Sequence, residues 1–154
     1  MIPSTARRVP DNTAPHVNDE IRRRAEERIA RVAASGPGAI AERLAQLDRE
    51  WDTERTLEMN ASLLAFTGVA LGAFVSPLWL ILPAVVTGFL FQHAVQGWCP
   101  PLPLFRRAGF RTQTEIDYER YALKALRGDF RQLPTDAEGR DSAAAVHALQ
   151  AVQS

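Results

Sequence analysis

The chain has 154 residues, in which 18 Lys and Arg balance 18 Asp and Glu, and its mean hydropathy is close to zero. These averages hide a segregated sequence, because no Asp, Glu, Lys or Arg occurs between Glu58 and Arg106, a block typical of a membrane protein. The remaining length leaves no room for a separate catalytic domain, and the mixed charges of the tails lack the one-signed patch that nucleic-acid binding needs. We therefore expect an all-α membrane protein that is not an enzyme and binds no nucleic acid.

The segment before the uncharged block divides into a tail and two helices. Residues 1–18 are rich in proline and poor in large apolar side chains, so we expect a disordered N-terminal tail. Residues 19–56 predict two amphipathic helices separated by a break at residues 35–38. The first carries an apolar stripe of Ile21, Ala25, Ile29 and Val32, and the second one of Ile40, Leu44, Leu47 and Trp51. The second stripe fits either a coiled-coil seam or a helix that lies on a membrane surface.

The uncharged block is too long for one membrane crossing and predicts a transmembrane helical hairpin. A helix needs about 20 apolar residues to cross roughly 30 Å of hydrocarbon. Residues 57–75 and residues 77–97 each have about this length. Between them, Ser76 and Pro77 are typical of an N-cap and the first position of a new helix. A single kinked helix over the same residues would reach about 60 Å, twice the hydrocarbon thickness.

The charges that flank the hairpin predict its orientation. Arginines stand on both sides of the hairpin, whereas its turn carries no charge, so both termini are expected in the cytoplasm. Trp79 and Trp98 are separated by about 28 Å of helix, which suits aromatic anchors at the two interfaces. The interface anchors we expect are Trp51, Trp79, Trp98, Arg106 and Arg107.

Small residues recur at helical spacing in both spans. Gly68, Gly72 and Ser76 share a face of the first helix, and Ala84 and Gly88 share a face of the second. Such faces allow close helix contact in lipid, either between two copies of the chain or within one hairpin. The sequence leaves these two alternatives open, and a homo-oligomer would most simply be a dimer.

Cys99 is the only cysteine, and it follows the second span directly. It excludes an intramolecular disulfide and a structural zinc site with several cysteines from one chain. Two nearby arginines would favour a thiolate, but no neighbouring His, Asp or Ser in the sequence suggests a triad. We expect a structural or exposed thiol, with a chemically active thiol as the alternative.

The histidines are scattered and predict neither a metal site nor a cofactor. His16, His93 and His147 lack metal-ligand spacing. His93 lies near the cytoplasmic end of the second span, where we expect a neutral ring in contact with water rather than a proton relay.

The chain after the spans predicts a juxtamembrane region and a tail. Residues 98–133 hold the Cys-Pro element, in which Pro100, Pro101 and Pro103 break regular structure, and then an amphipathic helix that opens at Thr112 or Thr114. Its expected apolar contacts are Ile116, Tyr121, Leu123, Leu126, Phe130 and Leu133. Residues 134–154 form a flexible C-terminal tail with an alanine-rich stretch that suits a frayed helix.

Residues 51 to about 112 resemble the YgaP-like transmembrane domain family of bacterial inner-membrane proteins. The resemblance rests on the turn Ser76-Pro77-Leu78-Trp79, on Gly97-Trp98-Cys99-Pro100-Pro101-Leu102, and on Arg106, Arg107, Ala108 and Gly109. It implies a multi-pass helical hairpin that can dimerise in the bacterial inner membrane, fused in some members to a rhodanese sulfurtransferase domain. This chain is too short to hold that domain, so sulfurtransferase activity is not carried over, and only Cys99 matches the family's Cys-Pro position.

Three functions remain in competition. The first is a non-enzymatic membrane module that self-associates in the lipid bilayer and presents its cytoplasmic helices to an unidentified protein partner. The second is a thiol-dependent sulfur relay or redox sensor that uses Cys99. The third is an oligomeric pore built from several hairpins.

Overall fold

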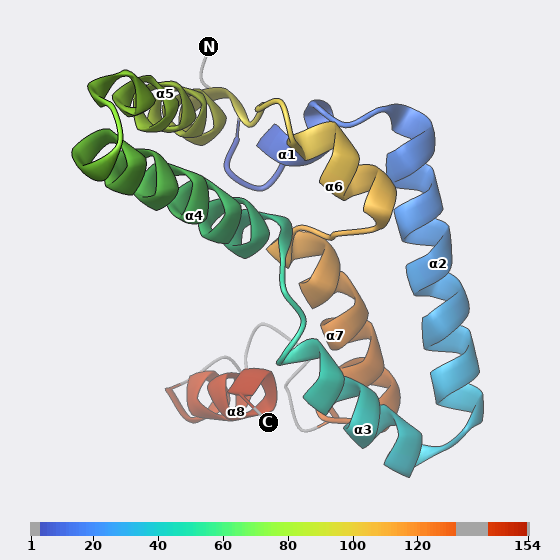
Figure 1. Cartoon of the computed structure of the whole chain (residues 1–154). Coiled ribbons are helices and arrows are strands. Elements are labelled where there is room, and N and C mark those ends of the chain that lie inside the picture. The colour runs from blue at the N-terminus through green and yellow to red at the C-terminus, as the bar shows by residue number, and fades with distance from the viewer. Residues whose placement is uncertain (1–3, 132–141, 154) are drawn as a thin grey trace. The chain divides into compact units, whose positions relative to one another are not determined.

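The computed structural model describes residues 4–131 and 142–153, and within those ranges it contains helices and no strand (Figure 1). The all-α prediction is confirmed. The elements are α1 (Arg8–Asp11), α2 (Pro15–Ala34), α3 (Pro37–Leu47), α4 (Thr53–Phe74), η1 (Pro77–Leu80), α5 (Ile81–Gln96), α6 (Leu102–Ala108), α7 (Gln113–Arg127) and α8 (Ser142–Gln153), where η1 is a 3₁₀ turn.

The chain forms two compact units. Among the described residues, the first comprises 4–22 and 51–114, and the second comprises 23–50, 115–131 and 142–153. Helix α2 begins in the first unit and continues in the second.

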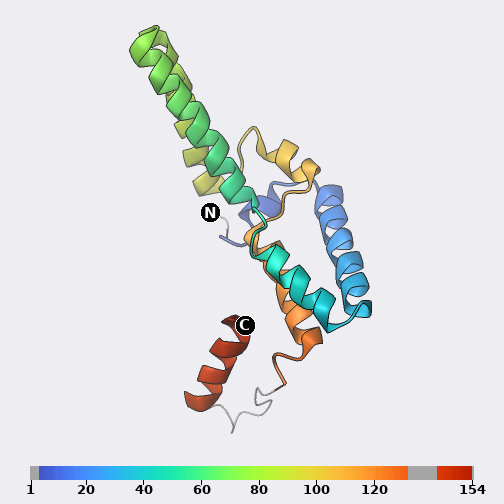
Figure 2. The same ribbon diagram turned by 60° about the horizontal axis from the view of Figure 1, so that its bottom comes forward.

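In the first unit, α4 and α5 pack side by side and are joined by a short turn that contains η1 (Figures 1 and 2). Both α4 and the helical stretch Pro77–Gln96 are long and apolar enough to cross a membrane. Asp52 caps α4 by accepting a 2.8 Å hydrogen bond from the backbone N–H of Arg55. Ser76 occupies the N-cap position of η1, but its side chain makes no capping hydrogen bond.

The glycines of α4 lie against the opposite arm of the hairpin. A Cβ at Gly68 would stand 2.5 Å from Pro83 Cδ, and one at Gly72 would stand 2.6 Å from Leu80 Cδ2. A Cβ at Gly88 on α5 would meet no atom within 4 Å. The small-residue face of α4 is therefore used for contact within the hairpin, whereas Gly88 faces open space.

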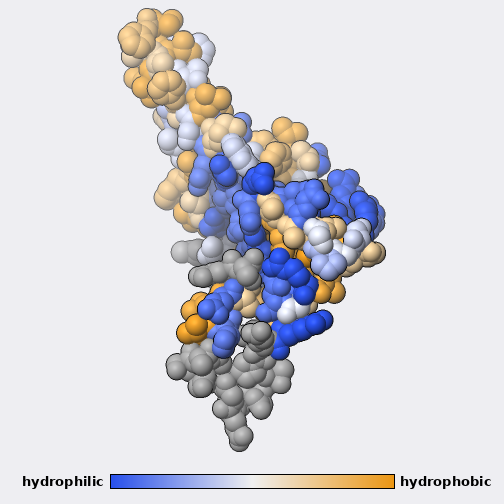
Figure 3. All heavy atoms as spheres, turned by 90° about the horizontal axis from the view of Figure 1, so that it is seen from below, coloured by the Kyte–Doolittle hydropathy of each residue, from blue (hydrophilic) through white to orange (hydrophobic). Residues whose placement is uncertain are grey.

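Large apolar side chains cover the outside of the hairpin. Phe66, Phe74 and Phe91 are 72%, 89% and 72% exposed. Figure 3 shows hydrophobic residues gathered over the end of the α4–α5 hairpin. No other element within residues 4–131 and 142–153 covers these side chains, and an apolar surface of this kind is typical of an interaction site.

The N-terminal segment differs from the expected disordered tail, because residues 8–11 and 15–18 are helical. Val9 is 2% exposed and packs with Leu57 and Leu102 in the core of the first unit. Asn12 donates a 2.8 Å hydrogen bond from Nδ2 to the carbonyl of Gln96 at the end of α5. Polar residues whose composition is typical of a disordered tail therefore hold this segment against the hairpin.

Helix α6 differs from the prediction, because its prolines were interpreted as residues that break regular structure. Pro101 and Pro103 lie at the start of α6, where the missing N–H costs no helical hydrogen bond. The prediction that Arg106 is an interface anchor is wrong, because Arg106 is 1% exposed. Its guanidinium donates to Thr13 Oγ1, to Asn18 Oδ1 and to the carbonyl of Phe110 at 3.2, 2.9 and 2.9 Å.

In the second unit, the apolar stripe of α3 is buried within the chain. Ile40, Leu44 and Leu47 pack with Ile116 and Leu123 of α7. The three residues of the stripe that predicted a coiled-coil seam or a membrane-surface helix are therefore buried against another helix of the same chain. Trp51, the last member of the predicted stripe, lies beyond the end of α3 and is 41% exposed, with the guanidinium carbon of Arg55 4.3 Å from its ring centroid.

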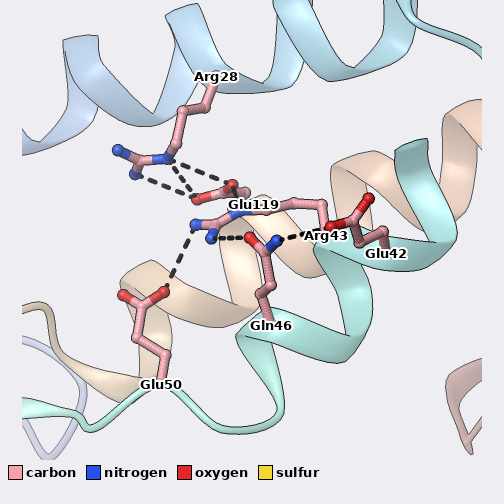
Figure 4. A network of polar contacts seen from close by, with 6 residues as sticks. All are labelled: Arg28, Glu42, Arg43, Gln46, Glu50 and Glu119. Carbon is pink, nitrogen blue, oxygen red and sulfur yellow. Dashed lines mark hydrogen bonds and ion pairs between the residues drawn. The ribbon is translucent and has the colours of Figure 1, made fainter.

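A buried ion-pair network also joins the helices of the second unit (Figure 4). The fully buried Glu119 of α7 accepts hydrogen bonds from Arg43 Nε of α3 at 2.7 Å and Arg28 Nη2 of α2 at 3.2 Å. Glu50 lies 3.4 Å from Arg43 Nη2. Burial alone would lower the pKa of Arg43, but hydrogen bonds and charge from Glu119 and Glu50 raise it overall.

The predicted helix after the Cys-Pro element ends earlier than expected. Helix α7 stops at Arg127, and Gly128 follows with a φ of 94°, which favours glycine. Tyr121 and Leu126, two of its expected apolar contacts, are 41% and 55% exposed. Leu133 and the first part of the predicted tail lie outside the described residues, and the alanine-rich stretch forms α8.

Candidate functional site

The open end of the hairpin brings together an acid and a histidine. Glu54 lies in the first turn of α4, and His93 lies in the last turn of α5. Because the two helices run in opposite directions, these ends meet, and His93 Nε2 stands 2.9 Å from Glu54 Oε2. Gly97 ends α5 in the left-handed conformation, and a Cβ there would stand 2.3 Å from the carbonyl oxygen of Arg8.

Arg8 completes the polar group on the side of Glu54. Its Nη2 donates a 2.9 Å hydrogen bond to Glu54 Oε1, so the two carboxylate oxygens have different partners. The side chains of Arg8 and Glu54 are 23% and 31% exposed, whereas that of His93 is 3% exposed. Arg8 therefore fixes the carboxylate that in turn holds the imidazole.

His93 is buried, which corrects the expectation of a ring in contact with water. An ionised carboxylate only accepts hydrogen bonds, so the Nε2 atom that faces Glu54 carries the proton. The Nδ1 atom of a neutral His93 is then a lone-pair acceptor, and it is buried without a hydrogen-bond partner among the residues that the structure describes.

Cys99 follows His93 by six residues, just beyond the end of α5. Cys99 is 4% exposed and packs against Val9, Leu57 and Leu102. The sequence around Cys99 suggests no triad, and the structure adds that Glu54 at the start of α4 holds the His93 ring.

A largely apolar pocket opens beside the sulfur. It has a volume of about 290 Å³, and its walls include Leu57 and Leu64 of α4, Phe89 of α5, Phe105 of α6 and Cys99. Asn60 is the one amide in its lining. A pocket that joins an apolar volume to a reactive atom is typical of a ligand site.

The pair of Glu54 and His93 suits proton transfer. A carboxylate on one nitrogen of an imidazole orients the ring and stabilises its charged form. No group of three His, Cys, Asp or Glu suited to a metal ion occurs in residues 4–131 and 142–153.

The other predicted anchors lie away from this site. Trp79 is 44% exposed at the closed end of the hairpin, Trp98 is half-buried beside Cys99, and Arg107 is exposed. The sequence reasoning missed Arg8 and Glu54. A usable signal was present for Glu54, because a hairpin that turns near Ser76 places residue 54 level with the last turn of the second helix.

No protein-family model matches the chain, and no curated protein or solved structure matches it either.

Proposed function

We propose that the chain is a small integral membrane protein whose α4–α5 hairpin crosses the bilayer and which acts as a non-enzymatic, self-associating module. The observation that carries this proposal is the exposure of apolar side chains along two helices of spanning length. Burial in hydrocarbon removes this surface from water, at about 25 cal/mol per Å² of apolar area. The resemblance to YgaP-like domains points to the bacterial inner membrane as the bilayer.

The proposed topology has both termini in the cytoplasm. Basic residues flank the open end of the hairpin, among them the exposed Arg55 and Arg107, whereas the turn at Ser76 carries no charge. Positive residues are retained on the cytoplasmic side of membrane proteins. The second unit and the C-terminal segment then face the cytoplasm, where an unidentified protein partner can bind them.

Self-association is assigned to the outward face of α5. Ala84 and Gly88 are both exposed and lie one helical turn apart, and Gly88 leaves room for a close helix partner. The glycines of α4 are already in contact with η1 and α5, so we assign them to the hairpin and not to the dimer.

Cross-linking of the full chain in lipid nanodiscs tests this assignment. Gly88→Leu should abolish the dimer, whereas Ala73→Leu, which places the same side chain on exposed α4 surface, should leave it intact. Alkaline carbonate extraction tests insertion itself. A chain that carbonate releases from membranes, or a dimer insensitive to Gly88→Leu, contradicts the corresponding part of the proposal.

A second candidate function is a thiol-dependent role for Cys99, either as a sulfur relay or as a redox sensor. The place of Cys99 in the wall of the pocket, six residues after a histidine that Glu54 orients, favours it. The test is the alkylation rate of Cys99 by iodoacetamide, a small neutral reagent, in wild type and in His93→Gln. Equal rates would remove the thiol-dependent role.

A further inference from the structure

Helix α5 has two faces with different surroundings. One face packs on α4 and lines the pocket, and its residues are Leu82, Pro83, Val86, Phe89 and Leu90. The outward face is exposed, and its apolar residues are Ile81, Ala84, Gly88, Phe91 and Val95. These five are spaced by three, four, three and four residues, which is the a/d repeat of two helices that pack as a left-handed pair.

Two polar side chains flank this apolar repeat. Thr87 precedes Gly88 and Gln92 follows Phe91, so the two lie on opposite edges of the repeat, at its g and e positions. The Thr87 hydroxyl donates to the carbonyl of Pro83 at 2.7 Å, so its oxygen is left as an acceptor. Within the described residues, no hydrogen bond involves the Gln92 amide, which has two N–H donors.

Gln92 lies inside the segment that we assign to the membrane. It stands four residues before Gln96, the last residue of α5, which corresponds to about 6 Å of helix. Hydrocarbon offers no water to an amide, and a hydrogen bond to a neighbouring helix offsets that cost. Because the outward face points away from α4, the neighbour that meets it is a helix of another chain.

We propose that two copies of the chain pack the outward faces of α5 as a parallel, left-handed pair, in which Gln92 of each copy donates to the Thr87 hydroxyl oxygen of the other. This inference rests on the proposed self-association and names the contacts that define it. Copies inserted in the same direction have parallel α5 helices, and a parallel pair places each g position beside the next e position of the partner. Residues 87 and 92 have this relation.

A second copy fits this face because the donor and the acceptor are on the same helix. A twofold axis then pairs both at once and gives two identical hydrogen bonds, whereas an unrelated helix would need matching groups at both positions. Gly88 lies at the centre of the repeat and meets no atom within 4 Å, which lets the two backbones approach closely.

Fluorescence energy transfer between labelled copies in phospholipid liposomes tests the polar pair. The full chain carries Cys99→Ser and is labelled through Arg107→Cys at the exposed open end. We expect Gln92→Leu and Thr87→Val each to weaken the dimer about tenfold, and the double variant to be no weaker than either. Gln96→Leu at the exposed end of α5 is the matched control and should leave the dimer unchanged.

Oxidative cross-linking of single cysteines in the Cys99→Ser chain tests the face. Val95→Cys on the outward face should form a disulfide-linked dimer, whereas Val86→Cys on the face toward α4 should not.

The outcomes separate the inference from the function on which it rests. A dimer that Gln92→Leu weakens no more than Gln96→Leu, or one that cross-links through residue 86 as readily as through residue 95, overturns the inference. If Gly88→Leu still abolishes that dimer, the proposed self-association stands without the polar pair. A wild-type chain that stays monomeric overturns both. If Gln92→Leu does not fold, Thr87→Val and the two cysteine variants carry the test.

Discussion

Removal of the Glu119 carboxylate should loosen the second unit. Glu119 is fully buried and bonds to guanidinium groups from two other helices, so Glu119→Ala leaves Arg43 and Arg28 without their shared partner. Breaking a buried ion pair costs about 3–5 kcal/mol. We expect the lower end, about 3 kcal/mol, because the Arg43 side chain keeps Glu50 and that of Arg28 is 31% exposed.

Hydrogen exchange of the full chain in detergent measures this loss where it occurs. A loss of about 3 kcal/mol corresponds to roughly 100-fold faster exchange of amides that exchange through opening of the unit. Peptides from α3 and α7 should show this change, whereas peptides from the α4–α5 hairpin should not.

A matched control separates burial from charge. Glu27→Ala breaks the pair of Arg23 and Glu27 on α2, whose side chains are 57% and 51% exposed, and should alter stability by less than about 0.5 kcal/mol. The double variant Glu119→Leu with Arg43→Met should recover part of the loss, because apolar groups replace the pair. If Glu119→Ala exchanges like the Glu27→Ala control, the network does not stabilise the unit and the reasoning is refuted.

Two further predictions concern the first unit. Gly68→Ala places a Cβ 2.5 Å from the ring of Pro83, so it should cost about 1–3 kcal/mol of hairpin stability. Gly88→Ala meets no atom and should gain up to about 1 kcal/mol from the better helix propensity of alanine. Thermal unfolding followed by circular dichroism compares the two, and equal midpoints would show that Gly68 is not in close contact. Arg106→Met removes three hydrogen bonds of a buried guanidinium and should cost about 3 kcal/mol, whereas Arg107→Met on the surface should stay within about 0.5 kcal/mol. The same unfolding assay checks this pair, and an effect at Arg107 as large as that at Arg106 would contradict the assignment of stability to the buried guanidinium.

The sequence predicted the elements that depend on composition and period. The uncharged block gave two helices of spanning length, and their observed positions lie within a few residues of residues 57–75 and 77–97. The break at residues 35–38 followed from glycine and proline chemistry. These features are local, so one stretch of sequence contains their cause.

The sequence could not predict which partner each side chain meets. Arg106 and Arg107 are neighbours of the same type, yet one is buried and the other is exposed, because only Arg106 faces the carbonyl of Phe110 and the N-terminal segment. The composition of that segment is typical of disorder, and its order depends on distant groups such as the carbonyl of Gln96.

The candidate site was predicted only in part for the same reason. Cys99 was identified as the residue with inherent chemistry, and His93 as a polar group near the end of a span. Glu54, which holds the His93 ring, is far from it in the chain and meets it only when α4 and α5 pack. The pocket depends on the combined shapes of α4, α5 and α6, for which no short motif exists.

The most direct test of the central claim is the sidedness of the hairpin. Single cysteines replace Val75, 69% exposed at the turn, and the exposed Arg107 at the open end, each in a Cys99→Ser chain. A membrane-impermeant maleimide is applied to intact cells and to inverted membrane vesicles. The account predicts labelling of Val75→Cys in intact cells and of Arg107→Cys only in inverted vesicles. Labelling of both positions from the same side would show that the hairpin does not cross the bilayer.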